Sequence, residues 1–263
     1  MKKLVLALTA LAAFTGSASA ADLAARPYTK APVAAPIAYN WTGCYIAGGG
    51  GYGWSNAEGR QVDPVTGAFV AHEGTTGGRG WAGQGGAGCD YQFAGPLGNW
   101  VVGAFGDYTF SDIKGDHIGA PVTTTVGNLK QDWSWAVGGR VGLLVNPTFL
   151  TYVSAGYTET HFAQTNYFSF VAPGTATGTA LPGATYNGWF IGSGFEYGLS
   201  FVPGLFLKTE ARVSQFDRKQ LNVFTTATGL PTGTAETIKP FTESVITSLV
   251  YRFNWGGPVV AKY

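Results

Sequence analysis

The sequence predicts an all-β protein, an eight-stranded antiparallel up-and-down transmembrane β-barrel. Three observations favour it: eight amphipathic, glycine-rich segments follow one another, the connections between them alternate between short and long, and only 12% of the 263 residues are charged while 14% are aromatic. Barrels that span a bacterial outer membrane have short turns on one side and longer loops on the other. After the first 20 positions there is no apolar run of about 18 residues, so no transmembrane helix is expected.

The N-terminal segment has the three parts of a secretory signal. Two lysines are followed by an apolar core and then by small residues that end at Ala20. This pattern predicts a signal peptide over residues 1–20 with cleavage between Ala20 and Ala21. Residues 21–39 are rich in proline and alanine and show no strand alternation, so they are predicted to form an extended periplasmic linker.

The barrel itself is assigned to residues 40–263. Each predicted strand exceeds the ~9–11 residues that a tilted strand needs to cross a membrane. The predicted strands are 41–54, 79–93, 99–110, 131–144, 148–162, 186–199, 204–216 and 238–253. The predicted short turns are 94–98, 145–147 and 200–204, and the predicted long loops are 55–77, 111–130, 163–185 and 217–237.

Alternation of apolar and polar residues decides which face of a strand is inward. It is clearest in 204–216, where leucine, alanine and valine oppose Lys208, Glu210 and Arg212. Three other strands place tryptophan and other bulky residues opposite glycine and a few ionic groups; they are 99–110, 131–144 and 186–199. The patterns of the first and fifth strands are too weak to assign a facing. Eight strands enclose a narrow interior, so glycine and the ionic groups are expected inside and the bulky residues outside, against lipid.

The inward faces then carry four acidic and four basic side chains. Because an unpaired charge in a confined interior is costly, these groups are expected to form a structural ion-pair network that fills the lumen. The expected members are Asp90, Asp107, Glu196, Glu210, Arg140, Lys208, Arg212 and Arg252.

The two cysteines fit an oxidising compartment. Cys44 and Cys89 fall near the periplasmic ends of the first two strands, which are antiparallel neighbours, so a disulfide is predicted. The alternative is that they are two small apolar residues of the barrel wall. Metal binding by this pair is not expected, because only two sulfurs are available and no histidine is near.

The charged residues exclude one class of partner. Of the 16 basic side chains, two lie in the signal segment, which leaves 14 against 15 acidic ones. These charges are dispersed and no basic patch stands out, so nucleic acid is not an expected partner.

Three short motifs resemble one family. They are Trp41-Thr42-Gly43-Cys44-Tyr45-Ile46, Gly88-Cys89-Asp90-Tyr91-Gln92-Phe93 and Leu249-Val250-Tyr251-Arg252-Phe253. In order and spacing they resemble the first, second and last strands of small alphaproteobacterial outer-membrane barrels, often called outer membrane immunogenic proteins or porin-family barrels. The resemblance implies a barrel similar to the OmpA transmembrane domain, located in the bacterial outer membrane.

The end of the last predicted strand resembles an assembly signal. Apolar residues recur on one face, at Phe241, Val245 and Leu249, and lead to the aromatic residues Tyr251 and Phe253. This resembles the signal that the barrel-assembly machinery recognises, and the resemblance makes that machinery an expected partner. Residues 254–263 follow and end in a second aromatic, Tyr263.

The predicted mature start, Ala21-Asp22, carries a further resemblance. Some barrels similar to this one are attached covalently to peptidoglycan through such an N-terminus. The resemblance implies attachment through Ala21 and Asp22, with the linker spanning the gap to the cell wall. The alternative is that Ala-Asp merely follows a common cleavage site.

The leading functional hypothesis is a structural outer-membrane barrel that supports envelope integrity and contacts outer-membrane lipids and lipopolysaccharide. A small passive diffusion pore is an alternative, although open porin channels use about 16–18 strands. Surface adhesion or recognition is another alternative, since the predicted loop 163–185 is rich in Gly, Thr, Ala and Pro.

An enzyme is not expected, and no catalytic, cofactor-binding or metal-binding residue is predicted. Deacylation or acyl transfer on lipid A would need a nucleophile beside a positioned base. His72 and His117 fall in predicted loops, and His161 ends a predicted strand with no serine that can be placed beside it.

Overall fold

The computed structural model describes residues 40–119 and 124–253. All regular elements in these ranges are β-strands. Within these ranges there is no helix with the length and apolar character needed to cross a membrane. The predicted signal peptide, its cleavage site at Ala20 and Ala21, the linker, the Asp22 attachment residue and the residues after the last strand lie outside the described residues.

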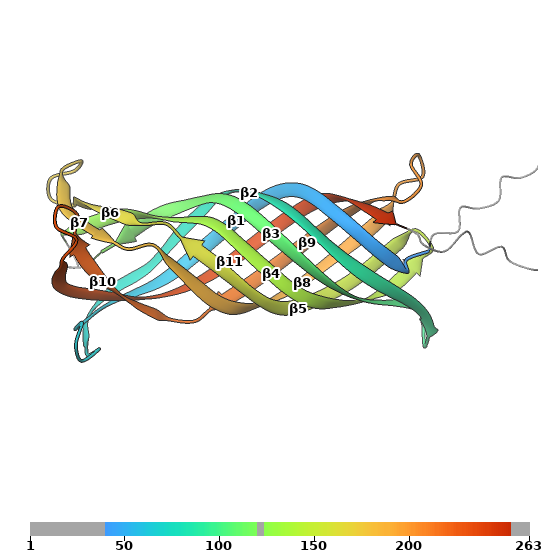
Figure 1. Ribbon diagram of the computed structural model, residues 1–263, viewed down its shortest axis with the longest axis horizontal. Helices are drawn as coiled ribbons and strands as arrows, with labels where there is room; N and C mark the ends of the chain where they lie inside the picture. The colour runs from blue at the N-terminus through green and yellow to red at the C-terminus, as the bar shows by residue number, and fades with distance from the viewer. Residues whose placement is uncertain (1–39, 120–123, 254–263) are drawn as a thin grey trace, which may run out of the picture. The chain divides into compact units, whose positions relative to one another are not determined.

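Eight strands form a closed antiparallel ring (Figure 1). Consecutive strands of the ring pair with one another, and the last closes on the first through a register that runs from Cys44 opposite Phe253 to Val62 opposite Ala235. In ring order the strands are β1 (Gly43–Val62), β2 (Phe69–Gly95), β3 (Gly98–Ile118), β4 (Thr125–Asn146), β5 (Phe149–Phe162), β8 (Ala184–Gly198), β9 (Leu205–Phe216) and β11 (Pro231–Phe253). The predicted all-β, eight-stranded up-and-down barrel is confirmed.

The connections at one end of the ring are short, as predicted. They join β2 to β3, β4 to β5, and β8 to β9. The polypeptide enters β1 at this same end, because Gly43 pairs with Asp90 near the end of β2.

The predicted long loops are wrong in extent. Most of their residues are strand: β1 and β2 run on to a turn at residues 63–68, and β3 continues to Ile118. Where β5, β8 and β9 end, three further strands take their places, namely β6 (Thr165–Ser169), β7 (Ala176–Leu181) and β10 (Lys219–Thr225). β6 pairs with β4 and β7, and β10 pairs with β7 and β11, so the ring stays closed here too. We call this part of the barrel the outer section.

The sequence predicts loops here because most outward residues of the outer section are polar, such as Asp112, Lys114 and Lys130, so the regular apolar alternation of a lipid-facing strand is absent. Its inward residues nevertheless form a hydrophobic core. The fully buried members are Tyr167, Leu181, Tyr186, Val223 and Ile238, with Ala57, Leu129, Phe162 and Phe216 beside them. A core of this kind stabilises strands without any lipid contact.

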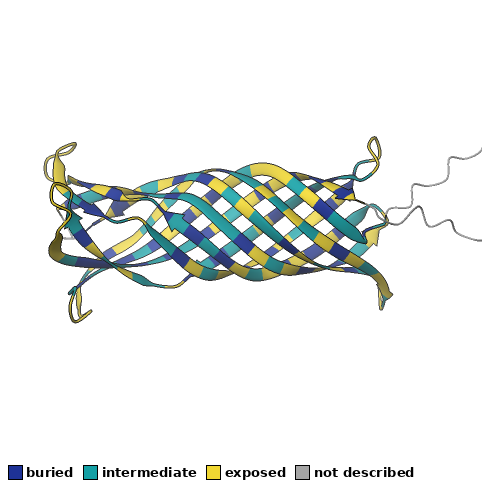
Figure 2. Ribbon diagram, in the orientation of Figure 1, coloured by how far each residue is buried: buried dark blue, intermediate teal, exposed yellow. Residues whose placement is uncertain are grey.

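Nearer the short turns the interior also contains a hydrophobic core, but here large apolar side chains lie on the outside as well. Figure 2 shows the alternation of buried and exposed residues along each strand. The exposed aliphatic side chains of this belt include Ile46, Val102, Val137, Val141, Val153, Ile191, Val245 and Leu249. Exposed aromatic residues flank them, including Trp54, Trp81, Phe110 and Trp189 toward the outer section and Tyr91, Phe93, Tyr197, Tyr251 and Phe253 toward the short turns.

Two histidines that were predicted in loops lie in strands. His72 is an exposed residue of β2, and His117 is a fully buried residue of β3. The correction has the same cause as above, since both residues belong to the outer section, where the outward alternation is polar.

Candidate functional site in the barrel interior

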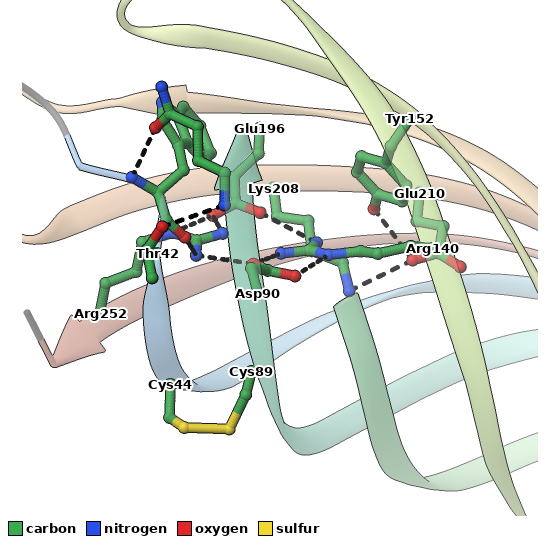
Figure 3. Close-up of polar contacts among 12 residues, drawn as sticks. Thr42, Cys44, Cys89, Asp90, Arg140, Tyr152, Glu196, Lys208, Glu210 and Arg252 are labelled. Carbon is green, nitrogen blue, oxygen red and sulfur yellow. Dashed lines mark hydrogen bonds and ion pairs between the residues drawn. A yellow bond between two sulfur atoms is a disulfide. The ribbon is translucent and has the colours of Figure 1, made fainter. Parts of the chain in front are cut away.

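Four charged side chains from four strands close the interior near the short turns. We call Asp90, Arg140, Glu196 and Arg252 the ion ring (Figure 3). Arg140 donates two hydrogen bonds to Asp90 and one, of 3.1 Å, to Glu196. Arg252 donates to Asp90 at 2.7 Å and to Glu196 at 2.7 and 3.1 Å. Each carboxylate therefore meets both guanidinium groups, and the formal charges cancel.

The ion ring is closed to solvent. Its four side chains are between 0% and 2% exposed. Charges this deeply buried require partners on every side, because the desolvation penalty is several kcal/mol per ion. The bidentate contact of Arg140 with Asp90 supplies the favourable geometry that such a pair needs.

A second group of charges lies next along the interior. We call Asp107, Lys208, Glu210 and Arg212 the second layer. Arg212 binds Asp107 through two hydrogen bonds of 2.8 and 3.1 Å, and it also contacts Glu210 at 3.0 Å. Lys208 lies 3.2 Å from Glu210, so this layer is also formally neutral. All eight residues predicted for the lumen thus lie in two adjacent networks.

Aromatic rings line both networks. The Arg140 guanidinium lies 4.7 Å from the ring centre of Tyr45 and 5.1 Å from that of Tyr152, and Arg252 lies 4.8 Å from Trp41. A guanidinium over a ring face is held by cation–π attraction and leaves little room for water. The interior is therefore filled by packed rings and paired charges together.

Sequence reasoning did not identify these aromatic residues or the hydroxyl groups that complete the second layer. Tyr152 and Ser154 donate to the two oxygens of Glu210 at 2.9 and 3.0 Å. Tyr152 and Ser154 lie on β5, and Tyr45 lies on β1, the two strands whose sequence patterns are too weak to assign a facing. The alternation of side chains along the strand could have identified the β5 residues. The inward side chains of β5 are the even-numbered ones, such as Leu150, and Tyr152 and Ser154 belong to the same series.

Gly103 provides the space that the ion ring occupies. A Cβ atom at this position would lie 1.9 Å from Oδ1 of Asp90 and 2.7 Å from the carbonyl oxygen of Cys89. No side chain could be accommodated at that distance without moving Asp90 away from Arg140. The inward glycines are therefore part of the site, as the narrow lumen suggests.

Beyond the second layer the interior holds a small polar cavity of about 40 Å³. Hydroxyl and amide groups line it, including Gln84, Thr109, Ser134, Thr158 and Ser214. Since a water needs roughly 10–15 Å³ of such volume, the space suits a few waters and does not form an open channel.

Cys44 and Cys89 are directly opposite in the register of β1 and β2 and form a disulfide, with their Cα atoms 3.9 Å apart. Both side chains point outward, and Figure 3 shows Cys89 and its neighbour Asp90 on opposite faces of β2. The covalent link therefore joins the two strands directly behind the ion ring.

Tyr251 and Phe253, the predicted assembly signal, point outward on β11, with ring centres 5.2 Å apart. Arg252 between them points inward to the ion ring. The last residues of the strand thus combine an exposed aromatic pair with an interior charge.

No protein-family model and no curated protein matches this sequence. Among solved structures, the barrel is similar to the outer membrane protein OprG from Pseudomonas aeruginosa, with 14% identity over 82% of this chain and 100% of that one and a TM-score of 0.47. It is also similar to Neisserial surface protein A (12% identity, 81% and 98% coverage, TM-score 0.41) and to the outer membrane protease OmpT from Escherichia coli (11% identity, 80% and 97% coverage, TM-score 0.41). Identities this low assign neither a family nor an activity to the chain.

Proposed function

We propose that this protein is an integral barrel of the bacterial outer membrane with a closed interior, and that it serves a structural role in the envelope. The ion ring is the observation that carries the proposal. Its two acids and two bases are mutually paired and at most 2% exposed, so they fill the section of the barrel that a solute would have to cross.

The outward surface supports the membrane location. Aliphatic side chains form a belt that aromatic residues flank on both sides. A contiguous apolar surface of this kind is rare on a soluble protein. Lipid chains and interfacial headgroups, including lipopolysaccharide, are the surroundings that suit it.

Conductance tests the closed interior. Wild-type protein, refolded in lipid and shown to be folded by its gel mobility, is expected to give no stable current steps in a planar bilayer. Stable steps that depend on solute size would contradict the proposal and favour the diffusion pore. In that case Glu210→Gln should change ion selectivity, whereas Glu243→Gln, on the outward face of β11, should not.

We propose further that Ala21 and Asp22 attach the barrel to peptidoglycan. The polypeptide enters the barrel at the end with the short turns, which is the periplasmic end of such a barrel. Residues 21–39, at about 3.1 Å per residue if extended, would reach roughly 60 Å. Purified cell walls digested with muramidase are expected to release the N-terminal peptide joined to a muropeptide. Recovery of a free Ala21 amino group alone would overturn the attachment.

Surface recognition remains a prediction from sequence. The side chains best placed to contact a partner are exposed apolar residues at the tips of the outer section. Val65, Val171 and Leu230 are between 65% and 91% exposed there. His161 is held by Asp132, with Nδ1 2.7 Å from the carboxylate, and by stacking on Trp133; these contacts orient the imidazole but do not by themselves indicate catalysis.

A further inference from the structure

The outer section contains a second buried cluster of titratable groups, separate from the ion ring and the second layer. Glu73 of β2 is 2% exposed, and His117 of β3 and Glu236 of β11 are fully buried. One nitrogen or oxygen atom from each of the three lies within 4.8 Å of the others. Two consecutive strands, β2 and β3, and the distant β11 thus direct one imidazole and two carboxylates at a common point.

A β-bulge places Glu73 in this cluster. Gly59 pairs with Gly74 and the next residue, Arg60, pairs with His72, so Glu73 is the extra residue of β2. Gly74 has a positive φ of 86°, which suits glycine. A bulge re-aims a side chain, and here it turns Glu73 inward although the inward residues nearer the short turns are even-numbered.

Gly59 leaves the space into which Glu73 extends. A Cβ atom at Gly59 would lie 2.6 Å from Oε2 of Glu73 and 3.3 Å from Cε1 of His117. The bulge and this glycine together form a pocket that holds the carboxylate inside the barrel wall.

Neither carboxylate oxygen of Glu73 has a hydrogen-bond partner among the residues that the structure describes. A buried carboxylate without a donor is costly, and a cation facing it would remove the cost.

The other two groups are already oriented. Nε2 of His117 lies 2.9 Å from Oε2 of Glu236, a separation compatible with two ligands of one metal ion. Tyr167 donates a hydrogen bond of 2.6 Å to the other oxygen of Glu236, and the Thr76 hydroxyl lies 3.5 Å from Nδ1 of His117. Partners of this kind fix the orientation of metal-ligating carboxylates and imidazoles.

We propose that Glu73, His117 and Glu236 bind one divalent transition-metal cation, with Zn²⁺ as the best match. An imidazole with two carboxylates suits zinc, whereas Ca²⁺ takes six to eight oxygen ligands and Mg²⁺ prefers an octahedral shell with several waters. The two carboxylates would neutralise the charge of the ion, which accounts for an acidic pair in an otherwise apolar core. Bound metal would join β2, β3 and β11 across the outer section.

The test uses the full chain refolded in detergent with and without Zn²⁺, with bound zinc measured on the folded fraction and affinity measured by competition with a chelating dye. Wild-type protein is expected to bind one zinc per chain. Glu73→Gln is expected to bind at least about 100-fold more weakly, because loss of even an outer-shell partner costs 10–100-fold. His161→Ala is the control, since His161 and Asp132 form a partly exposed pair on the outward face, and it should bind as the wild type does.

A second readout does not depend on one variant. Co²⁺ added during refolding should give visible absorption bands in wild-type protein that are lost in His117→Gln. Folded wild-type protein without stoichiometric metal would overturn the proposal. So would equal zinc affinities for wild type and Glu73→Gln, or a loss of binding in His161→Ala alone.

Discussion

Replacing Glu196 with glutamine is expected to lower the free energy of unfolding by about 3–5 kcal/mol, the range for removing one partner of a buried ion pair. Glutamine keeps the shape of the side chain and removes its charge. Asp90 would then be the one carboxylate left in the ion ring to face Arg140 and Arg252, so these described residues would hold one uncompensated positive charge at 0–2% exposure. Urea titration of the folded barrel in lipid vesicles measures the change.

The outward face offers a matched control. Glu243→Gln makes the same chemical change on β11 at an exposed position and is expected to alter stability by less than about 0.5 kcal/mol. A loss below about 1 kcal/mol for Glu196→Gln, similar to that for Glu243→Gln, would show that the ion ring is not held by charge balance.

A double-mutant cycle separates charge balance from packing. Arg140→Met alone leaves Asp90 and Glu196 facing one guanidinium, but combining it with Glu196→Gln leaves Asp90 paired with Arg252. The double variant is therefore expected to lose less stability than the sum of the single losses, by about 0.5–3 kcal/mol. Strict additivity would contradict the interpretation that the four residues act as one network.

The barrel and the residues of its charged interior could be predicted because both follow from the alternation of inward and outward side chains along each strand. Side chains alternate across a strand, so the position of Glu210 between outward residues assigns it to the interior without any knowledge of its partners. Which acid meets which base could not be predicted, since Arg140 and Glu196 come from strands that are not adjacent in the ring, and their contact depends on the tilt of the strands.

The outer section and its metal-ligating candidates could not be predicted for a different reason. The predicted strands depend on a regular apolar outward face, and beyond the belt most outward residues are polar. The bulge adds a second difficulty for Glu73. One extra residue in a strand reverses which of the preceding side chains point inward, so the inward facing of Glu73 cannot be extrapolated from the rest of β2. His117 and Glu236 are 119 residues apart, and only closure of the ring brings them to 2.9 Å.

Two adjacent glycines of β1, Gly48 and Gly49, differ in the space available for a side chain where β1 closes the ring against β11. Gly49→Val is expected to abolish folding, because a Cβ atom there would lie 2.1 Å from the Thr247 carbonyl oxygen and 2.4 Å from the Ser248 Cα atom. These are backbone atoms of β11, so no change of rotamer relieves the overlap. Gly48→Val makes the same substitution one residue earlier, where the side chain points outward and meets nothing within 4 Å.

The pair is matched in residue type, in strand and in intrinsic β-propensity, so a difference between the two variants isolates the close approach of β1 to β11. Gly48→Val should refold with wild-type yield and show the mobility of a folded barrel on an unheated gel, whereas Gly49→Val should migrate as unfolded chain. Equal failure of both variants would mean that β1 needs glycine for flexibility and not for space. Folding of both would mean that β1 and β11 can separate at this point without opening the barrel, which the 19 paired positions along their seam make costly.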